Sequence, residues 1–304
     1  MGKLLPIANV LGPVLMVFSA TLLLPIGAAF WYQDGTAWDF LQAMMLTLGG
    51  GYLLWLSTRR FKRELKPRDG FLLVTLVWVL IAAFATLPLM SELRGLSFTD
   101  AFFETMSGLS TTGATVLDGL DRLPPAINLW RHELVWIGGM GIIVLAVAVL
   151  PLLGVGGRQL YKAETPGPMK DSQLTPRITE TAKNLWLVYF GITVACVLAL
   201  KWAGMSWFDA VCHAFSTMGL GGFSTHDASI GYFHSARIEF VLIVFMLIAG
   251  MNFATHFLAM RGRSLKPYLA DTEAKAFLLL VLGSCFAIGF YLWQTGTYPS
   301  FWTA

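Results

Sequence analysis

Residues 96–113 read Leu-Ser-Phe-Thr-Asp-Ala-Phe-Phe-Glu-Thr-Met-Ser-Gly-Leu-Ser-Thr-Thr-Gly, and residues 205–222 read Met-Ser-Trp-Phe-Asp-Ala-Val-Cys-His-Ala-Phe-Ser-Thr-Met-Gly-Leu-Gly-Gly. The two stretches match at an offset of 109 residues, with Ser, Asp, Ala, Ser and Gly at the same places. Each follows one long apolar run and precedes another. Self-similarity of this kind is the mark of a repeated structural unit.

Each copy predicts a short helix that cannot cross a bilayer. Ser97 and Ser206 each stand three residues before an Asp, which is typical of a helix N-cap. A helix of about 12 residues is roughly 18 Å long, so we expect helices over 98–109 and 207–218 that enter the membrane and stop midway. The Gly-containing segments 110–114 and 219–223 then form extended strands. Extended backbone at that depth must be buried in protein or line a water-filled cavity.

The arrangement of span, short re-entrant helix, extended strand and span is that of a potassium-channel filter, whose backbone carbonyls replace the water shell of the ion. The short helix also points its negative C-terminal end at the ion. A glycine-rich loop between transmembrane helices is the ordinary alternative for a single copy. Two copies with the same cap and the same flanking spans favour the filter.

Composition places the chain in a membrane. Of its 304 residues, 56% are hydrophobic and 13% charged, against about a quarter charged in soluble domains. Three cysteines are too few for a disulfide framework. Nucleic-acid binding is excluded because the basic residues sit in short loops between apolar runs, and the histidines lack the spacing of a metal site.

Seven apolar runs are long enough to span a bilayer: 8–32, 36–57, 70–90, 132–153, 184–204, 236–260 and 274–295. Most of the 21 Lys and Arg fall in the loops 57–69, 154–183 and 261–275. The positive-inside rule places these loops and the N-terminus in the cytoplasm. The expected fold class is therefore an all-α membrane protein.

The chain resembles the Trk-type potassium-uptake permeases, the superfamily of TrkH, KtrB and plant HKT transporters. The resemblance rests on the motifs at 103–115, 214–224 and 136–141 (Trp-Ile-Gly-Gly-Met-Gly). The first two spans look like the extra N-terminal helix pair of the TrkH branch. The resemblance implies span–pore-helix–span repeats around one pore, as in voltage-gated channels, and potassium as the transported ion without a covalent cofactor.

The same resemblance implies the site residues. Gly113 and Gly222 match the filter glycines of the family, and serine at the first of these positions goes with sodium. The carbonyls before them, on Thr111, Thr112, Leu220 and Gly221, are the expected potassium ligands. A Gly113→Ser change is expected to alter potassium/sodium discrimination while the protein stays folded.

The resemblance also implies the organisation of the chain. Residues 1–57 are the N-terminal helix pair, 58–153 the first pore repeat, 154–260 a cytoplasmic connector with the second repeat, and 261–304 the first span of an incomplete third repeat. The implied location is a bacterial inner membrane. The implied partners are lipid, a second copy of the chain and a cytosolic ring of nucleotide-binding, TrkA-like regulatory subunits.

The family builds its filter from four strands, and the two strands present here are too few to surround an ion. We therefore expect that the chain alone does not conduct. It is then a fragment of a longer protein, a truncated product or a subunit that needs a partner. The alternative reading is a truncated membrane protein without transport. Channel-like flux and coupled symport both stay open. A seven-helix pump or receptor is disfavoured because the last span has no lysine to form a Schiff base with retinal. A membrane-embedded enzyme is disfavoured because no set of catalytic residue types lies at the same depth in several spans.

Several polar residues around the repeats carry open alternatives. Glu104 and His213 share one position on the two short helices and either tune the electrostatics of the pore or form hydrogen bonds behind the filter. Acids of the outer loops, among them Asp121 and Asp227, either attract cations or are simply solvated. Arg131 is expected to anchor the protein at the membrane interface.

Overall fold

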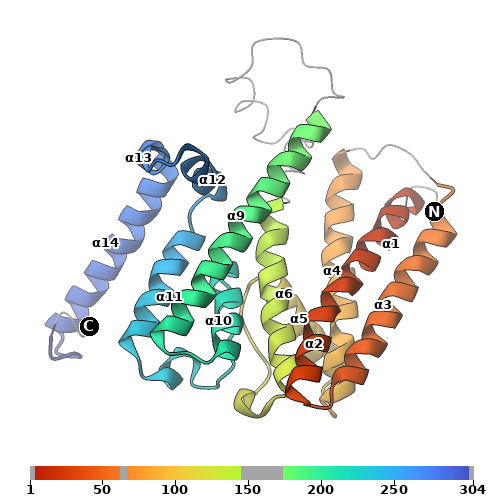
Figure 1. The fold of residues 1–304 in the computed structure, drawn as a ribbon, viewed down its shortest axis with the longest axis horizontal. Helices are drawn as coiled ribbons and strands as arrows, with labels where there is room; N and C mark the ends of the chain where they lie inside the picture. The colour runs from red at the N-terminus through yellow and green to blue at the C-terminus, as the bar shows by residue number, and fades with distance from the viewer. Residues whose placement is uncertain (1–3, 62–66, 145–173, 301–304) are drawn as a thin grey trace, which may run out of the picture.

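The computed structural model describes residues 4–61, 67–144 and 174–300, and within them the chain is all helical (Figure 1). Five helices in the described residues are long and apolar enough to cross a membrane, and a sixth span is formed if one bent pair is counted as a single crossing. The all-α membrane fold expected from the sequence is thereby confirmed.

The N-terminal pair consists of two antiparallel rods. The first is made of α1 (Leu5–Ser19), a short 3-10 turn (Ala20–Leu22) and α2 (Leu23–Tyr32), and the second is α3 (Ala37–Thr58). They lie side by side at one edge of the bundle (Figure 1). Phe18 and Phe40 from the pair are buried against Trp130, at ring-centroid distances of 5.8 and 6.2 Å.

Two units with the same order of elements follow. The first has α4 (Pro67–Glu92), α5 (Phe98–Leu109), a 3-10 turn η2 (Leu120–Arg122) and α6 (Pro125–Val144). The second has α9 (Leu174–Ala203), α10 (Trp207–Gly219), a 3-10 turn η5 (Ser229–Phe233) and α11 (Ala236–Ala249). The two units join where α6 packs against α10.

Two predicted spans begin well before their expected first residues. α6 begins at Pro125 rather than 132, because Pro fits the first turn of a helix, and its predicted end at 153 lies outside the described residues. α9 begins at Leu174, so residues 174–183 extend the helix instead of belonging to the connector. The rest of the predicted connector, 154–173, lies outside the described residues.

The predicted span 236–260 is not one continuous helix. α11 ends at Ala249, and α12 (Phe253–Gly262) leaves it at an angle of 94°. Asn252 is the N-cap of α12, with its side chain accepting a hydrogen bond from the amide of Ala254 at 2.9 Å. Hydropathy does not detect this break because both halves are apolar, whereas the cap makes a new helix start.

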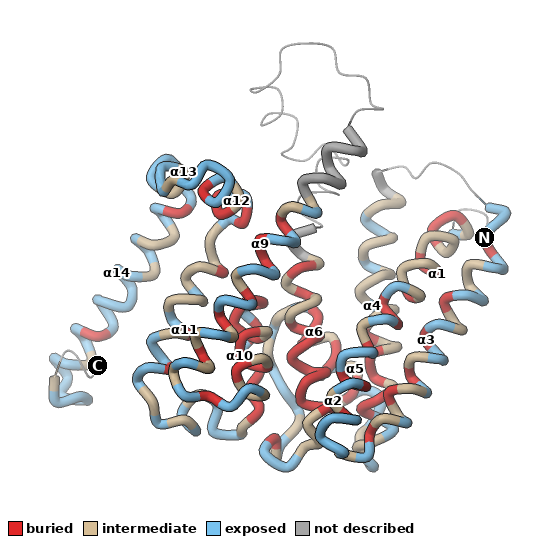
Figure 2. The backbone as a smooth tube through the Cα atoms, in the orientation of Figure 1, coloured by how far each residue is buried: buried red, intermediate tan, exposed pale blue. Residues whose placement is uncertain are grey.

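The last helices stand apart from the bundle. α13 (Lys266–Ala270) and α14 (Thr272–Gln294) are joined to the rest through α12, and α14 buries only Ala274 and Gly289 (Figure 1). Buried residues concentrate instead on α6, α5 and α10, in the lower half of the molecule as drawn (Figure 2). The core of the described protein therefore surrounds the two short helices.

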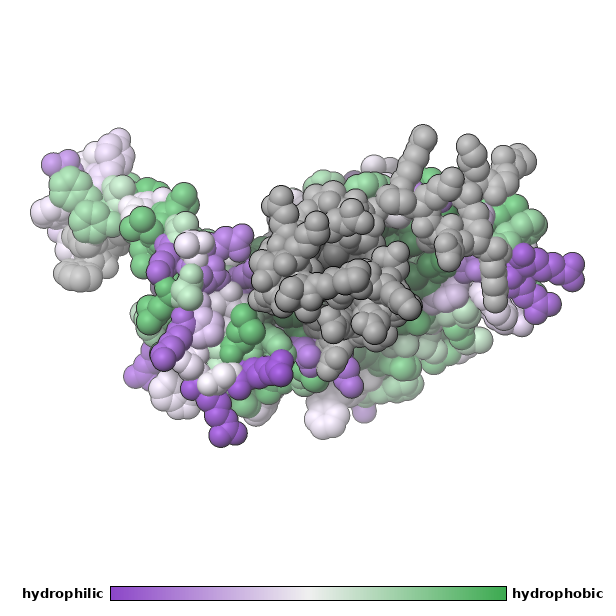
Figure 3. Space-filling model, turned by 90° about the horizontal axis from the view of Figure 1, so that it is seen from above, coloured by the Kyte–Doolittle hydropathy of each residue, from purple (hydrophilic) through white to green (hydrophobic). Residues whose placement is uncertain are grey.

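The N-terminus and the described parts of the basic loops lie at one end of the bundle (Figure 1). These parts contain Arg59, Arg60, Arg261, Arg263 and Lys266. Seen from that end, hydrophilic side chains gather to both sides of the atoms drawn in grey (Figure 3). The short helices start from the opposite end, so the basic end and the helix starts are on different faces.

Candidate functional site: two re-entrant turns that meet

The two short helices begin with the same cap. The Ser97 hydroxyl accepts a hydrogen bond from the Asp100 amide at 3.1 Å and donates to the Asp100 carboxylate at 2.7 Å. Ser206 and Asp209 repeat the pattern at 3.0 and 2.7 Å. The cap satisfies an amide that no helical carbonyl reaches. The bounds Phe98–Leu109 coincide with the predicted range, and α10 is one residue longer than expected.

The turns after the two helices share one backbone conformation. Thr111 and Leu220 have φ of 57° and 55°, and the glycines Gly113 and Gly222 have φ of 74° and 86°. The amides of Thr112 and Gly221 each bond the carbonyl of the residue five earlier, both at 2.9 Å. The 109-residue repeat found in the sequence therefore extends to individual torsion angles.

The two turns lie against each other. A Cβ atom added to Gly113 would stand 1.5 Å from the carbonyl oxygen of Gly221. Only a residue without a side chain allows this approach, and only Gly adopts the positive φ without strain. The predicted filter segments thus converge at one place, between α6 and α10, instead of facing separate directions.

The first filter segment is fixed from behind by the helix that precedes it. The Ser107 hydroxyl donates to the Ala114 carbonyl at 2.6 Å. The Glu104 carboxylate, whose side chain is 1% exposed, accepts from the Thr115 hydroxyl at 2.9 Å and from the Val116 amide at 3.1 Å. Of the two roles considered for Glu104, the structure shows the hydrogen bonding, to residues that directly follow the predicted filter segment.

The second segment is held by an imidazole at the place where the first has a carboxylate. Nδ1 of His213 donates to the Asp209 carbonyl at 2.8 Å, which leaves Nε2 to accept from the Ser224 hydroxyl at 3.1 Å. His213 and Ser224 are the counterparts of Glu104 and Thr115 at the 109-residue offset. The repeats therefore share a geometry but not a charge.

Arg131 is not the interfacial anchor that the sequence predicted. Its side chain is buried and its Nε lies 2.8 Å from Oε1 of Glu104. An interfacial location was expected only because Arg131 stands at the start of an apolar run. The signal that was missed is Glu104, since a carboxylate buried in a membrane protein requires a partner.

The outer loops are tied across the two repeats. Nδ1 of His226 donates to Asp121 at 2.5 Å, and Asp227 accepts from the Leu120 amide at 3.0 Å. His226 also stacks on Tyr232, with ring centroids 3.5 Å apart. These two carboxylates thus hold the loops of the two repeats together.

The pH dependence of this tie follows from Asp121. The hydrogen bond from His226 is the largest cause that lowers the pKa of the Asp121 carboxyl below its ordinary value of 3.8. A depressed carboxyl pKa stabilises the folded state above the unfolded pKa, and this contribution is lost as the pH falls through the folded pKa. We expect the difference in melting temperature between the native chain and Asp121→Asn to shrink below about pH 4, where the Asp121 carboxylate becomes protonated.

Thermal unfolding in detergent, followed by tryptophan fluorescence at several pH values, measures that difference. Asp118→Asn, at an exposed carboxylate of the same loop, is the control and should show no such pH dependence. A difference between Asp121→Asn and the native chain that stays the same down to pH 3 would contradict the assignment.

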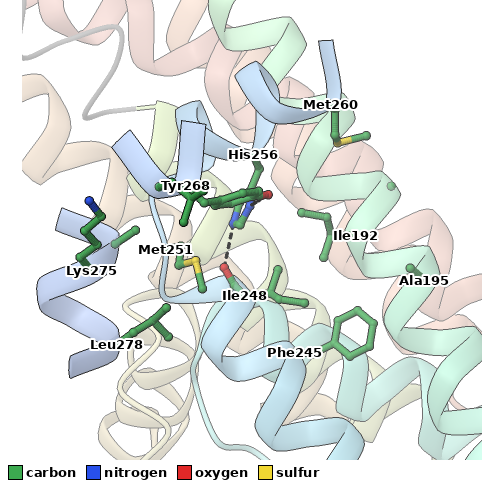
Figure 4. A pocket seen from close by; sticks show the side chains of 13 residues that line it. Ile192, Ala195, Phe245, Ile248, Met251, His256, Met260, Tyr268, Lys275 and Leu278 are labelled. Carbon is green, nitrogen blue, oxygen red and sulfur yellow. Dashed lines mark hydrogen bonds between the residues drawn. The ribbon is translucent and has the colours of Figure 1, made fainter. Parts of the chain in front are cut away.

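The bend between α11 and α12 forms a second candidate site (Figure 4). A cavity of about 780 Å³ is lined there mainly by apolar side chains from α9, α11 and α14. At its upper rim, His256 Nε2 donates to the Ile248 carbonyl and Nδ1 accepts from the Tyr268 hydroxyl, both at 2.8 Å. His256 therefore fixes contacts between α11, α12 and α13.

A resident metal site is absent from the described residues, where no group of three or more His, Cys, Asp or Glu side chains is placed to hold an ion. The polar groups of the re-entrant turns are backbone carbonyls and hydroxyls. Such oxygen ligands suit a weakly held cation in transit rather than a tightly bound transition metal.

The comparisons with known proteins agree with this geometry. A family profile named TrkH and described as "Cation transport protein" matches residues 37–295. The chain belongs to the TrkH family. Its members are transport proteins and not enzymes, as the sequence predicts, and the expected TrkH branch is confirmed.

Relatives of known name support the same membership. The Trk system potassium uptake protein TrkH of Halomonas elongata is 52% identical over 97% of this chain, and that of Escherichia coli K12 is 50% identical over 97%. A crystal structure of the potassium transporter TrkH from Vibrio parahaemolyticus superposes with a TM-score of 0.87 at 44% identity over 99% of this chain. The chain spans 61–62% of the length of these TrkH proteins.

Proposed function

We propose that this chain forms half of the filter of a Trk-type potassium uptake system in the bacterial inner membrane. The observation that carries the proposal is the contact between the two re-entrant turns at Gly113 and Gly221. Carbonyls of Thr111, Thr112, Leu220 and Gly221 are the proposed ligands that replace the water of a potassium ion.

Electrostatics of the short helices supports a cation at this place. The C-terminal end of a helix carries a partial negative charge, and α5 and α10 both end immediately before the turns. Glycines at 113 and 222, rather than serine, fit the potassium preference of the family. The domain organisation set out from the sequence, with two pore repeats after an N-terminal helix pair, belongs to the same proposal.

The orientation and partners are part of the proposal. The first described residues and the described parts of the basic loops lie at one end of the bundle, which the positive-inside rule places in the cytoplasm. A homodimer in the membrane and a ring of nucleotide-binding regulatory subunits beneath the basic end complete the assembly. The relatives' printed names, "Trk system potassium uptake protein", support a system of several components.

Two filter segments leave part of the circumference of an ion without carbonyls, so the chain alone is proposed not to conduct. Purified chain in liposomes should show no rubidium uptake above that of empty liposomes. A fusion of this chain to the remaining part of the Halomonas elongata relative should restore growth of a potassium-uptake-deficient strain on low potassium.

The two arms separate the claims. Uptake by the chain alone would contradict the need for further filter segments. A fusion that reaches the membrane at normal amounts and transports no potassium or rubidium would contradict the proposed function itself. We expect rubidium uptake by the fusion and no uptake by the chain alone.

A further inference from the structure

Arg131 lies behind both filter segments at once. Its guanidinium pairs with Glu104, and both side chains are 1% exposed. Nη2 donates to the hydroxyl of Thr115, which directly follows the first segment, at 3.2 Å. Nη1 donates at 3.4 Å to the carbonyl of Ser224, which directly follows the second segment, and the guanidinium carbon lies 4.5 Å from the ring centroid of Phe223, the last residue of that segment.

The orientation of this side chain is itself fixed. Nη1 also donates to the side-chain oxygen of Asn128, one turn earlier on α6, at 3.1 Å. Asn128 in turn donates to the Leu120 carbonyl at 2.9 Å. A planar fork with donors in fixed directions therefore meets acceptors on α5, α6 and both filter segments.

The second repeat offers no equivalent. At the positions of Glu104 and Thr115 it has the neutral pair His213 and Ser224, and the arginine of its second span, Arg237, is exposed. One arginine of the first repeat thus serves both segments. The buried pair is neutral overall, so it adds no net charge behind the proposed ion site.

We propose that Arg131 is a positioning residue that sets the distance between the two filter segments and thereby the discrimination between potassium and sodium. The inference rests on the proposed function of those segments. A filter selects between ions of different size and hydration only if its carbonyls keep their number and spacing. Arg131 forms hydrogen bonds to residues that follow the filter glycine in each of the two segments. Loss of these bonds would therefore change the distance between the segments first at these residues.

The test uses the fusion described above and measures rubidium and sodium uptake by tracer flux. Removing only one partner leaves a buried, unpaired charge and endangers folding, so the main variant is the doubly neutral Glu104→Gln/Arg131→Gln. We expect its rubidium-to-sodium ratio to fall about tenfold while the protein still transports, because polar contacts remain but the fork between segments is lost.

Arg131→Lys separates positioning from mere packing. Lysine keeps the charge and the pair with Glu104, so this variant should fold, but a single ammonium does not reach both segments as a fork does. We expect a ratio between those of the native protein and the double variant. Arg237→Gln is the matched control, since it removes an arginine from the exposed start of the second span, and its ratio should stay native.

The outcomes distinguish a failure of the proposed function from a failure of the inference about Arg131. If the native fusion takes up no rubidium, the proposed function fails and the inference with it. If the native fusion transports but both the double variant and Arg131→Lys keep the native ratio, only the inference is overturned. Should the double variant not be recovered from the membrane, the ratio of Arg131→Lys alone decides: a lowered ratio supports the inference and a native ratio overturns it.

Discussion

Alanine at Gly113 is expected to destabilise the chain by about 2–5 kcal/mol and to stop uptake by the fusion. The positive φ of 74° strains any residue with a side chain, which contributes about 1–2 kcal/mol. The added Cβ would also meet the Gly221 carbonyl at 1.5 Å, and such overpacking contributes about 1–3 kcal/mol more. Because the obstacle is backbone of the other filter segment, relief of the clash must separate the two turns.

Two controls separate these contributions. Gly222 has a φ of 86° but nothing within 4 Å of an added Cβ, so Gly222→Ala should show only the strain of about 1–2 kcal/mol. Gly119 has a φ of 66° and equally open space, in the loop beyond the filter, so Gly119→Ala should keep uptake. Chemical unfolding in detergent measures all three, and equal losses for Gly113→Ala and Gly222→Ala would refute the contact between the turns.

This contact also adds a consequence for the Gly113→Ser change. Gly113→Ser was expected to change ion discrimination in a protein that stays folded. Serine carries the same Cβ as alanine, so it meets the same carbonyl oxygen. Reduced stability must therefore accompany any change in discrimination.

The second large effect is expected at Gly138, in the middle of α6. An added Cβ would stand 1.9 Å from the carbonyl oxygen of Leu109, the last residue of α5. Overpacking costs about 1–3 kcal/mol, whereas glycine to alanine in a helix is otherwise favourable by about 1 kcal/mol, so we expect a net destabilisation of up to about 2 kcal/mol. The displaced carbonyl immediately precedes the first filter segment, so uptake by the fusion should also fall.

Gly141 supplies the control, one turn further along the same helix. A Cβ there meets only Trp78, at 3.7 Å, which is ordinary contact. Gly141→Ala should therefore be neutral or stabilising by up to about 1 kcal/mol. Unfolding curves in detergent for the two variants measure the difference. If Gly138→Ala were as stable as Gly141→Ala, α6 would not pack against the end of α5 as described.

The sequence predicted the short helices well because their signals are local. The cap at Ser97 or Ser206 acts within four residues, and helix length follows from the cap and the next glycines. The bend after Ala249 was missed although its cap, Asn252, is also local. Continuous apolar character on both sides outweighed it, since hydropathy reports on burial in lipid and not on the direction of a helix.

By itself the sequence determined the membrane environment, the 109-residue repeat and the two capped helices, because composition, period and caps are properties of neighbouring residues. Only the tertiary structure decided that the turns at Gly113 and Gly221 touch and that Arg131 bonds residues just after both proposed filter segments. The contact of Arg131 with Ser224 joins residues 93 positions apart, and no property of neighbouring residues predicts such a contact.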